Sequence, residues 1–309
     1  MMEDIWEVLP VELLASILGR VGMESLLLNV PFVCKSWYKA SLHPLCWEHL
    51  IFPELASSSG YDSLYEWKSW LKLTLNPSFF ESLVFPRVSR ISYHGTQDHQ
   101  VFFLDRFKAT YRINECSAVA LIKFVVHRSQ GKCTLLLLPF CNTEILIFIA
   151  QECPLLKTLS LDTHYFWQRA YMLKEVIGNW KCLENLALGN FFNLKDIMPK
   201  ISPKYCKNLV NFNSTGESIT EHDASAIVTN LPNVKYLYLM RARFQQHEKD
   251  PMTIILKGCK ELLHLDVSFS SGLRVDSNML KSAENIRTFN YSSPGLIYVV
   301  PDAYDHSYL

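Results

Sequence analysis

The sequence predicts an α/β fold: an N-terminal bundle of three short helices, followed by a short solenoid of about six to seven irregular strand–helix units. Three observations lead to this prediction. Apolar residues recur at helical spacing near the N-terminus, an apolar repeat fills the second half of the chain, and 49% of the 309 residues are hydrophobic. A chain of this length and composition can bury a large core, so we expect a folded protein rather than a disordered one.

The N-terminal segment has the apolar spacing of three short helices. One stripe of apolar side chains recurs at intervals of three and four residues: Leu9, Leu13, Leu14, Ile17, Leu18 and Val21. Pro10 suits the first turn of this helix, where a missing N–H costs nothing, and Gly22 is expected to end it. A second helix is expected over residues 24–30, and Pro31 opens a third. Such short helices have more apolar surface than they can bury among themselves, so we expect a partner to cover part of it.

An L-x-x-L-x-L pattern recurs six times in the second half of the chain. Its units span residues 156–161, 183–188, 209–213, 234–239, 262–267 and 286–291. The fourth position moves from Leu159 to Phe289 in five steps, a mean period of 26 residues, which is typical of a leucine-rich repeat. Leu135 and Leu137 lie about one period earlier and indicate a degenerate first unit.

Each unit is predicted to combine a short strand with a helical return. Side chains alternate along a strand, so Leu159 and Leu161 are expected to point inward and Ser160 outward. Apolar residues at helical spacing, such as Leu146 and Ile149, lie between the strands. No unit can cover its apolar face alone, so neighbouring units are expected to stack into a solenoid.

The nine cysteines include no C-x-x-C pair, and their number is odd. Both features disfavour a disulfide framework and a zinc ribbon, so we expect reduced thiols in an intracellular protein, cytoplasmic and/or nuclear. Cys153, Cys206 and Cys259 each lie three residues before the first leucine of a unit. A metal site is the alternative to buried thiols there. Equivalent positions lie one repeat apart, so we expect packing instead.

Composition and motifs disfavour several classes of function. The chain has 30 Lys+Arg and 30 Asp+Glu, so no excess charge is available to bind nucleic acid or an acidic membrane. No apolar run approaches the ~18 residues of a membrane span. No P-loop, G-x-G-x-x-G, H-E-x-x-H or G-x-S-x-G motif occurs, and His94 and His99 near Asp98 fit a polar loop better than a metal site. We expect no catalytic residue, no metal and no cofactor.

Several N-terminal residues follow a known pattern. The sequence reads W-E-V-L-P-V-E-L-L-A-S-I-L from Trp6, then V-C-K-S-W from Val33, and then Trp47. Over residues 5–52 this resembles an F-box, whose pattern is W-x-x-L-P-x-E-L-L-x-x-I-L, V-C-K-x-W and a later Trp. With the repeats, the chain is similar to F-box/leucine-rich-repeat proteins, especially their short plant-type members.

The resemblance implies a three-helix F-box joined to a leucine-rich-repeat solenoid, and a role as substrate receptor of an SCF-type (Skp–cullin–F-box) ubiquitin ligase. The F-box would bind a Skp-type adaptor and through it a cullin, while the repeats would bind a protein or peptide substrate. Transfer chemistry would belong to other subunits. The expected adaptor-binding residues, some of which must instead form the core of the bundle, are Trp6, Leu9, Pro10, Leu13, Ile17, Leu18, Val33, Cys34 and Trp37.

Side chains predicted to point away from the repeat core are mostly small and polar, with one exception. Around residues 236–243, tyrosine and methionine are followed by two arginines, and these residue types are enriched in binding hot spots. The predicted substrate-binding residues are Tyr236, Tyr238, Met240, Arg241, His264 and Asp266. The alternative is that these aromatic side chains pack against the C-terminal residues 297–300.

Three regions are predicted: an F-box over residues 1–52, a linker region with early irregular repeats over 53–130, and leucine-rich repeats over 131–309. Within the linker region, residues 118–129 have the spacing of a helix. Two alternatives to a ligase receptor stay open: a scaffold that binds a Skp-type adaptor without promoting ubiquitination, and an enzyme with a catalytic triad assembled in space.

Overall fold

The structure is a computed structural model that describes residues 9–53, 102–139, 141–161, 170–189, 194–245, 249–293 and 296–298. The chain forms two compact units, Met1–Asp162 (unit 1) and Thr163–Leu309 (unit 2). Both units combine helices with parallel strands, which confirms the predicted α/β class. The boundaries predicted at residues 52 and 130 fall inside unit 1, and the three predicted regions stay predictions.

Three short helices open the described part of unit 1: α2 (Val11–Leu18), α3 (Met23–Leu28) and α4 (Lys35–Ser41). Gly22 does not end α2, which stops at its C-cap Gly19. Instead, Gly22 is the N-cap of α3, with a φ of 84° that favours glycine. Pro31 lies in a 3-10 turn, η1 (Val30–Phe32), so the third helix begins after this turn rather than at the proline.

A second 3-10 turn, η2 (Pro44–Trp47), joins these helices through buried polar contacts. Trp47 is fully buried, and its indole N–H donates to the Ser41 carbonyl at 2.8 Å. The Cys46 thiol lies 3.2 Å from the carbonyl oxygens of both Ala15 and Ala40, and burial raises its pKa to about 12. The turn therefore fastens α2 to α4.

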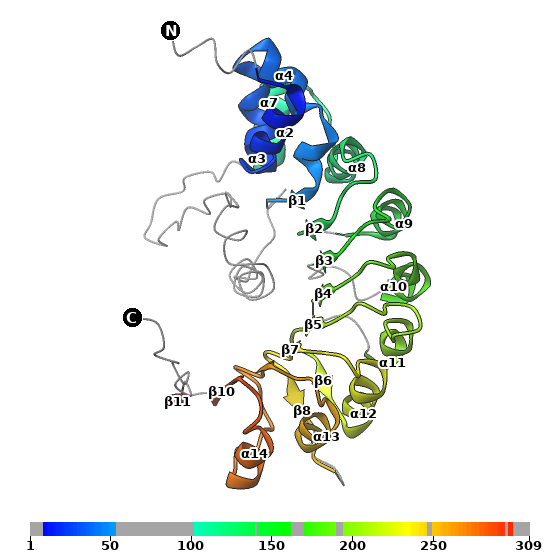
Figure 1. Ribbon diagram of the computed structural model, residues 1–309, viewed down its shortest axis with the longest axis vertical. Helices are drawn as coiled ribbons and strands as arrows, with labels where there is room; N and C mark the ends of the chain where they lie inside the picture. Colours follow the sequence, from blue (N-terminus) through cyan, green and yellow to red (C-terminus); the bar gives the residue numbers. More distant parts are fainter. Residues whose placement is uncertain are drawn as a thin grey trace. The chain divides into compact units, whose positions relative to one another are not determined.

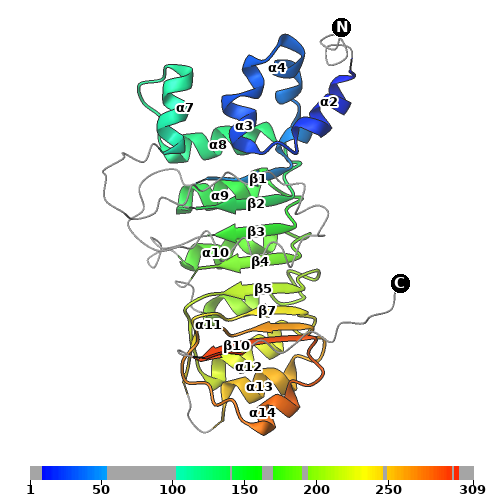
Figure 2. The same ribbon diagram turned by 90° about the vertical axis from the view of Figure 1, so that its left-hand side faces the viewer.

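Two further helices of unit 1 are α7 (Phe103–Tyr111) and α8 (Ala118–Arg128), shown in Figure 2. The Tyr111 hydroxyl donates to the Leu27 carbonyl at 2.6 Å, and Arg106 forms an ion pair with Glu24. These two contacts hold α7 against α3. The helix predicted over residues 118–129 is confirmed as α8, whereas α7 was not predicted.

Three parallel strands complete unit 1: β1 (His49–Ile51), β2 (Leu135–Leu138) and β3 (Thr158–Leu161). The register of β1 on β2 places His49 opposite Leu135, 86 residues later in the sequence. Helix α9 (Thr143–Glu152) connects β2 to β3 and buries Ile145 and Ile149. The degenerate repeat unit predicted at Leu135 is therefore a paired strand.

Unit 2 repeats this alternation of strand and helix (Figure 1). Its parallel strands pair in the order β4 (Asn185–Leu188), β5 (Asn211–Ser214), β7 (Tyr236–Tyr238), β9 (His264–Asp266) and β10 (Thr288–Ser293). The last of them also pairs with the antiparallel strand β11 (Leu296–Tyr298). A separate small sheet pairs β6 (Ser218–Ile219) with β8 (Arg243–Phe244).

The helical segments of unit 2 are α10 (Ala170–Val176), η3 (Ile177–Asn179), α11 (Leu194–Ile197), η4 (Met198–Lys200), α12 (Glu221–Asn230), α13 (Pro251–Gly258) and α14 (Ser277–Ser282). Side-chain caps start several of them. Thr220 and Asp223 form a reciprocal capping box on α12, and Asp250 and Asp276 accept from backbone N–H groups of α13 and α14. The polar residues between strands therefore fix where the helices begin.

The strand register of unit 2 aligns the inward positions of the repeat. Five residues are register partners on successive strands, and all are buried: Leu186, Phe212, Leu237, Leu265 and Phe289. This arrangement confirms that the fourth position of the L-x-x-L-x-L pattern faces the core. The residues on either side of it in each strand point to the opposite face.

The three repeat cysteines lie at corresponding buried positions. Cys153, Cys206 and Cys259 are 0%, 2% and 4% exposed, which confirms the expected buried thiols. Burial raises the pKa of Cys206 and of Cys259 to about 11. Across the described residues, no group of three potential metal ligands comes together. None of the helices in the described ranges is both long and apolar enough to cross a membrane.

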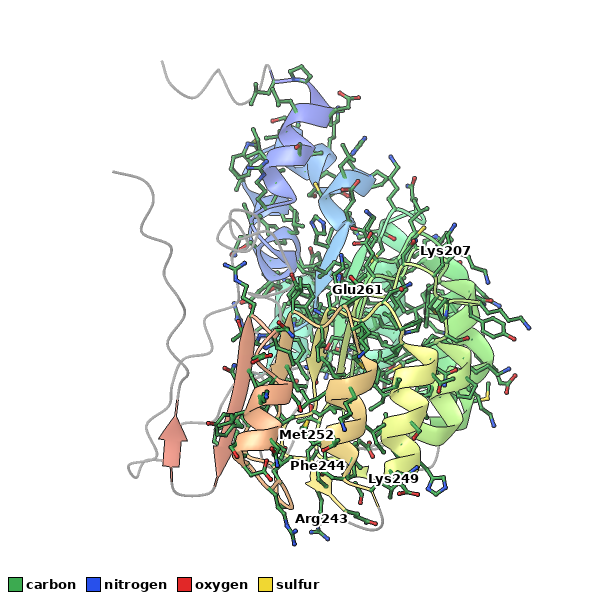
Figure 3. All side chains as sticks on the ribbon, turned by 60° about the horizontal axis from the view of Figure 1, so that its bottom comes forward. Lys207, Arg243, Phe244, Lys249, Met252 and Glu261 are labelled. Carbon is green, nitrogen blue, oxygen red and sulfur yellow. The ribbon has the colours of Figure 1, made fainter. Side chains whose placement is uncertain are left out.

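Two glycines of unit 2 mark close approaches between elements. Gly258 ends α13, and a Cβ at this position would overlap both methyl groups of Val228 in α12. Gly272 has a φ of 78°, and a Cβ there would collide with the Phe244 carbonyl oxygen. Figure 3 labels Phe244 and Met252 of unit 2, and both side chains are buried. Neither glycine can be replaced without a shift of its neighbour.

Candidate functional site

Large apolar side chains are exposed on the N-terminal helices and the turns that follow them. This N-terminal apolar set consists of Val11, Leu13, Ile17, Phe32, Val33, Tyr38 and Leu42. Leu13 and Ile17 lie one turn apart on α2 and therefore share a face. Phe32 and Val33 are 59% and 58% exposed. Such a concentration of exposed apolar residues in one short segment is typical of a protein-interaction surface.

The structure divides the predicted adaptor-binding residues into three groups. Pro10, Leu13, Ile17 and Val33 are exposed, whereas Leu9, Cys34 and Trp37 are half-buried. Leu18 is only 1% exposed, so it belongs to the core, and we correct the predicted set by removing it. Trp6 lies outside the described residues.

Four members of the apolar set were missed at the sequence level: Val11, Phe32, Tyr38 and Leu42. Phe32 and Tyr38 lie directly beside predicted residues of the V-C-K-S-W segment. Their apolar character could have been read from the sequence, but the direction in which their side chains point could not. That direction depends on how α4 and η1 turn against α2, which periodicity over so few residues does not fix.

Aromatic rings connect the N-terminal helices to α7 and α8. The ring centroids of Phe32 and Tyr111 lie 5.8 Å apart, those of Tyr111 and Phe107 4.8 Å, and those of Phe107 and Phe124 6.2 Å. These distances fall in the range of favourable aromatic pairs. The guanidinium of Arg128 then lies 4.5 Å from the Phe124 centroid. The row of rings therefore leads from the apolar set to a basic side chain.

The comparison with protein families bears on these helices. Residues 6–53 match the F-box-like family. The match includes α2, α3, α4 and β1, while α7 and α8 lie outside it. No curated protein matches the chain. We refer to residues 6–53 as the F-box-like region, and the exposed set described above lies within it.

Four of the predicted substrate-binding residues, Tyr236, Tyr238, His264 and Asp266, lie on β7 and β9, and the other two, Met240 and Arg241, lie in the turn after β7. Arg241 is exposed, and Tyr236, Met240 and Asp266 are half-buried. Tyr238 and His264 are 2% and 4% exposed. Because they are buried, we correct their predicted role: they are not free contact residues, although they lie beside the others.

Tyr238 and His264 form a closely packed pair, and one polar side-chain atom of each lacks a hydrogen-bond partner. Their ring centroids are 4.8 Å apart, and neither the Tyr238 hydroxyl nor His264 Nε2 has a hydrogen-bond partner. Burial raises the pKa of Tyr238, with Asp266 adding to the effect. Burial also lowers the pKa of His264, against the influence of Asp266. At neutral pH both rings are therefore uncharged.

Asp266 is held in place by two hydrogen bonds. Its Oδ1 accepts from the Ser268 N–H at 2.9 Å, and its Oδ2 accepts from the Asn290 side-chain amide at 3.2 Å. Asn290 is its register neighbour on β10. The carboxylate is therefore positioned by β10 on one side and by the turn that follows β9 on the other.

Three equivalent turns follow the strands β5, β7 and β9. Gly216, Arg241 and Phe269 each lie four residues after an aligned core position, and their φ angles are 77°, 55° and 60°. Backbone bonds join the turns: the Gly216 N–H donates to the Met240 carbonyl, and the Arg241 N–H to that of Ser268. Glycine adopts this left-handed conformation readily, whereas arginine and phenylalanine adopt it at a cost.

The polar residues His94, Asp98 and His99 lie outside the described residues, so the polar loop expected there stays a prediction.

Proposed function

We propose that this chain is a substrate receptor of an SCF-type ubiquitin ligase. Its F-box-like region would bind a Skp-type adaptor, and through it a cullin, while the strand face of unit 2 would bind a protein or peptide. One observation supports the adaptor part above all. The apolar side chains of Leu13, Ile17 and Val33 are exposed, and all three lie within the residues that match the F-box-like family. Covering apolar area is favourable by about 25 cal/mol per Å², so such side chains favour a bound partner.

In this function the chain contributes proximity rather than bond-breaking chemistry. Two binding surfaces on one chain raise the effective concentration of a bound substrate near the ubiquitin-carrying subunits. No side chain of the receptor then needs to touch the reacting atoms. The proposal therefore assigns binding roles, and no catalytic role, to the residues described above.

The adaptor part is tested by comparing Leu13→Asp with Leu155→Asp. The two leucines are 50% and 49% exposed in unit 1, so a charge at either position disturbs the fold similarly. We expect Leu13→Asp to weaken adaptor binding at least about tenfold, because it places a carboxylate in an apolar contact. Leu155→Asp should bind like the wild-type chain in isothermal titration calorimetry. Equal affinities for the two variants would contradict the assignment of this surface.

The substrate part rests on the residues around the Tyr238–His264 pair. Arg241 is exposed, and Tyr236, Met240 and Asp266 are half-buried, a composition typical of binding hot spots. We expect Tyr236→Ala with Arg241→Ala to release proteins that co-purify with the wild-type chain, while the adaptor stays bound. Mass spectrometry of the two purified complexes measures this. Unchanged recovery of every co-purifying protein would contradict the choice of surface.

A scaffold that binds the adaptor without ubiquitination would use the same apolar set, because adaptor docking alone requires no cullin. Reconstitution with adaptor, cullin, RING subunit and ubiquitin separates the two functions. A receptor predicts ubiquitination of a co-purifying protein, and this activity should be lost in Leu13→Asp. A scaffold predicts adaptor binding with no such product.

A further inference from the structure

Helix α8 carries two cations that lie over aromatic rings but differ in their partners. Lys123 Nζ lies 5.3 Å from the Phe148 centroid and forms an ion pair with Glu144 at 2.7 Å. Arg128 lies over two rings, 4.5 Å from the Phe124 centroid and 5.3 Å from that of Trp47. Throughout the described residues, no carboxylate lies within ion-pair distance of Arg128.

The guanidinium of Arg128 also has an unsatisfied donor. Its Nε is buried and lacks a hydrogen-bond partner. An outside group cannot reach this buried atom. A carboxylate of a partner would instead bond to the two terminal nitrogens of the planar guanidinium, which are not among the buried atoms without a partner. The position of Arg128 at the C-terminal end of α8 accounts for a positive charge there. It does not account for a guanidinium that has no carboxylate partner among the described residues.

Arg128 is half-buried, and several aromatic side chains around it are exposed. Phe124 and Tyr111 are 43% and 38% exposed, and Tyr38 is 50% exposed. Burial lowers the pKa of Arg128, while the nearby hydroxyls of Tyr111 and Tyr38 oppose that shift. An arginine stays protonated at neutral pH under such conditions. The site therefore presents a half-buried, permanent positive charge beside exposed aromatic side chains.

We propose that Arg128, with Phe124, Tyr111 and Tyr38, binds an aspartate or glutamate side chain of the Skp-type adaptor. The inference rests on the proposed function and adds a contact outside the residues that match the F-box-like family. Two observations favour the adaptor as the partner. Trp47 and Tyr38 belong to the F-box-like region, and the row of rings from Phe32 to Phe124 joins this site to the N-terminal apolar set.

The test measures adaptor binding by the full chain with Arg128→Met and, as matched control, Lys123→Met. Methionine keeps an apolar side chain over the rings in both cases and removes one charge. We expect Arg128→Met to raise the Kd for the purified adaptor at least about tenfold and to reduce its dependence on salt. Lys123→Met should change neither quantity more than about twofold, because Lys123 already has a carboxylate partner.

A double-mutant cycle identifies the partner group and excludes a merely structural role. Single Asp→Asn and Glu→Gln variants of the adaptor are titrated against the wild-type chain and Arg128→Met. One adaptor variant should lose affinity for the wild-type chain but lose no more for Arg128→Met. If Arg128→Met does not fold, Arg128→Lys replaces it in the cycle, because lysine lacks the bidentate fork.

The outcomes separate this inference from the proposed function. Absence of adaptor binding by the wild-type chain would contradict both. Wild-type binding with an unchanged Kd for folded Arg128→Met, or a cycle in which all effects add, would overturn the Arg128 site alone.

Discussion

At the scale of the residue, two of the four non-glycine residues with a positive φ in the described part of the chain, Arg241 and Phe269, lie in equivalent turns of unit 2. They stand where the preceding turn has Gly216. Phe269 is 66% exposed, so its side chain is not retained for the core. Residues held in such conformations concentrate at functional sites. Both lie after strands that carry predicted substrate-binding residues, which agrees with the surface proposed for the substrate.

We expect Phe269→Gly to make the fold of unit 2 more stable than Phe269→Ala by about 1 kcal/mol. Both substitutions remove the ring, but only glycine also removes the cost of a left-handed φ. Urea denaturation of the two variants measures the difference in free energy of unfolding. Equal stabilities would mean that the turn carries no strain at this position.

At the scale of the element, the sequence predicted what periodicity encodes. The stripe of α2, the helix at residues 118–129 and the aligned leucines of the repeat were all visible as spacing. The sequence did not show which of Leu13 and Leu14 faces water. Both fit the apolar stripe of a short helix, and only the packing of that helix decides which one is buried. Helix α7 and the contact of Arg128 with Trp47 depend on residues far away in sequence, and local patterns contain no information on such contacts.

The approach of α12 to α13 gives a prediction at this scale. Gly258→Ala should destabilise the protein by about 1–3 kcal/mol, because its Cβ overlaps the stiff, β-branched side chain of Val228. Gly178→Ala is the matched control, since a Cβ there meets only Tyr205 at 3.7 Å, an ordinary contact. Thermal denaturation measures both. A Gly258→Ala variant as stable as Gly178→Ala would contradict the close approach.

At the scale of the whole molecule, the F-box-like region is part of a larger unit. Its helices contact α7, and its strand β1 pairs with β2, so the unit extends beyond the residues that match the family. The F-box-like region was recognisable from its sequence because its motif is local. The extent of the unit was not recognisable, because a strand pairing across 86 residues has no sequence signature.

We expect a fragment of residues 1–162 to fold alone and a fragment of residues 1–53 not to do so. The shorter fragment lacks α7, α8 and the partner strand of β1, and it is too small to bury its apolar surface. Circular dichroism should give a cooperative thermal transition for the longer fragment only. A cooperative transition of residues 1–53 at the same temperature would contradict this unit boundary.

The pairing of β1 with β2 also has a consequence for the nascent chain. Ribosomes add about 5–20 residues per second, so Leu135 is made about 4–17 s after His49. During that interval β1 has no partner strand in β2. The helices before β1, which carry the exposed apolar side chains, leave the ribosome before β2 does. A partner that binds these helices during translation would have only this interval before β1 pairs with β2.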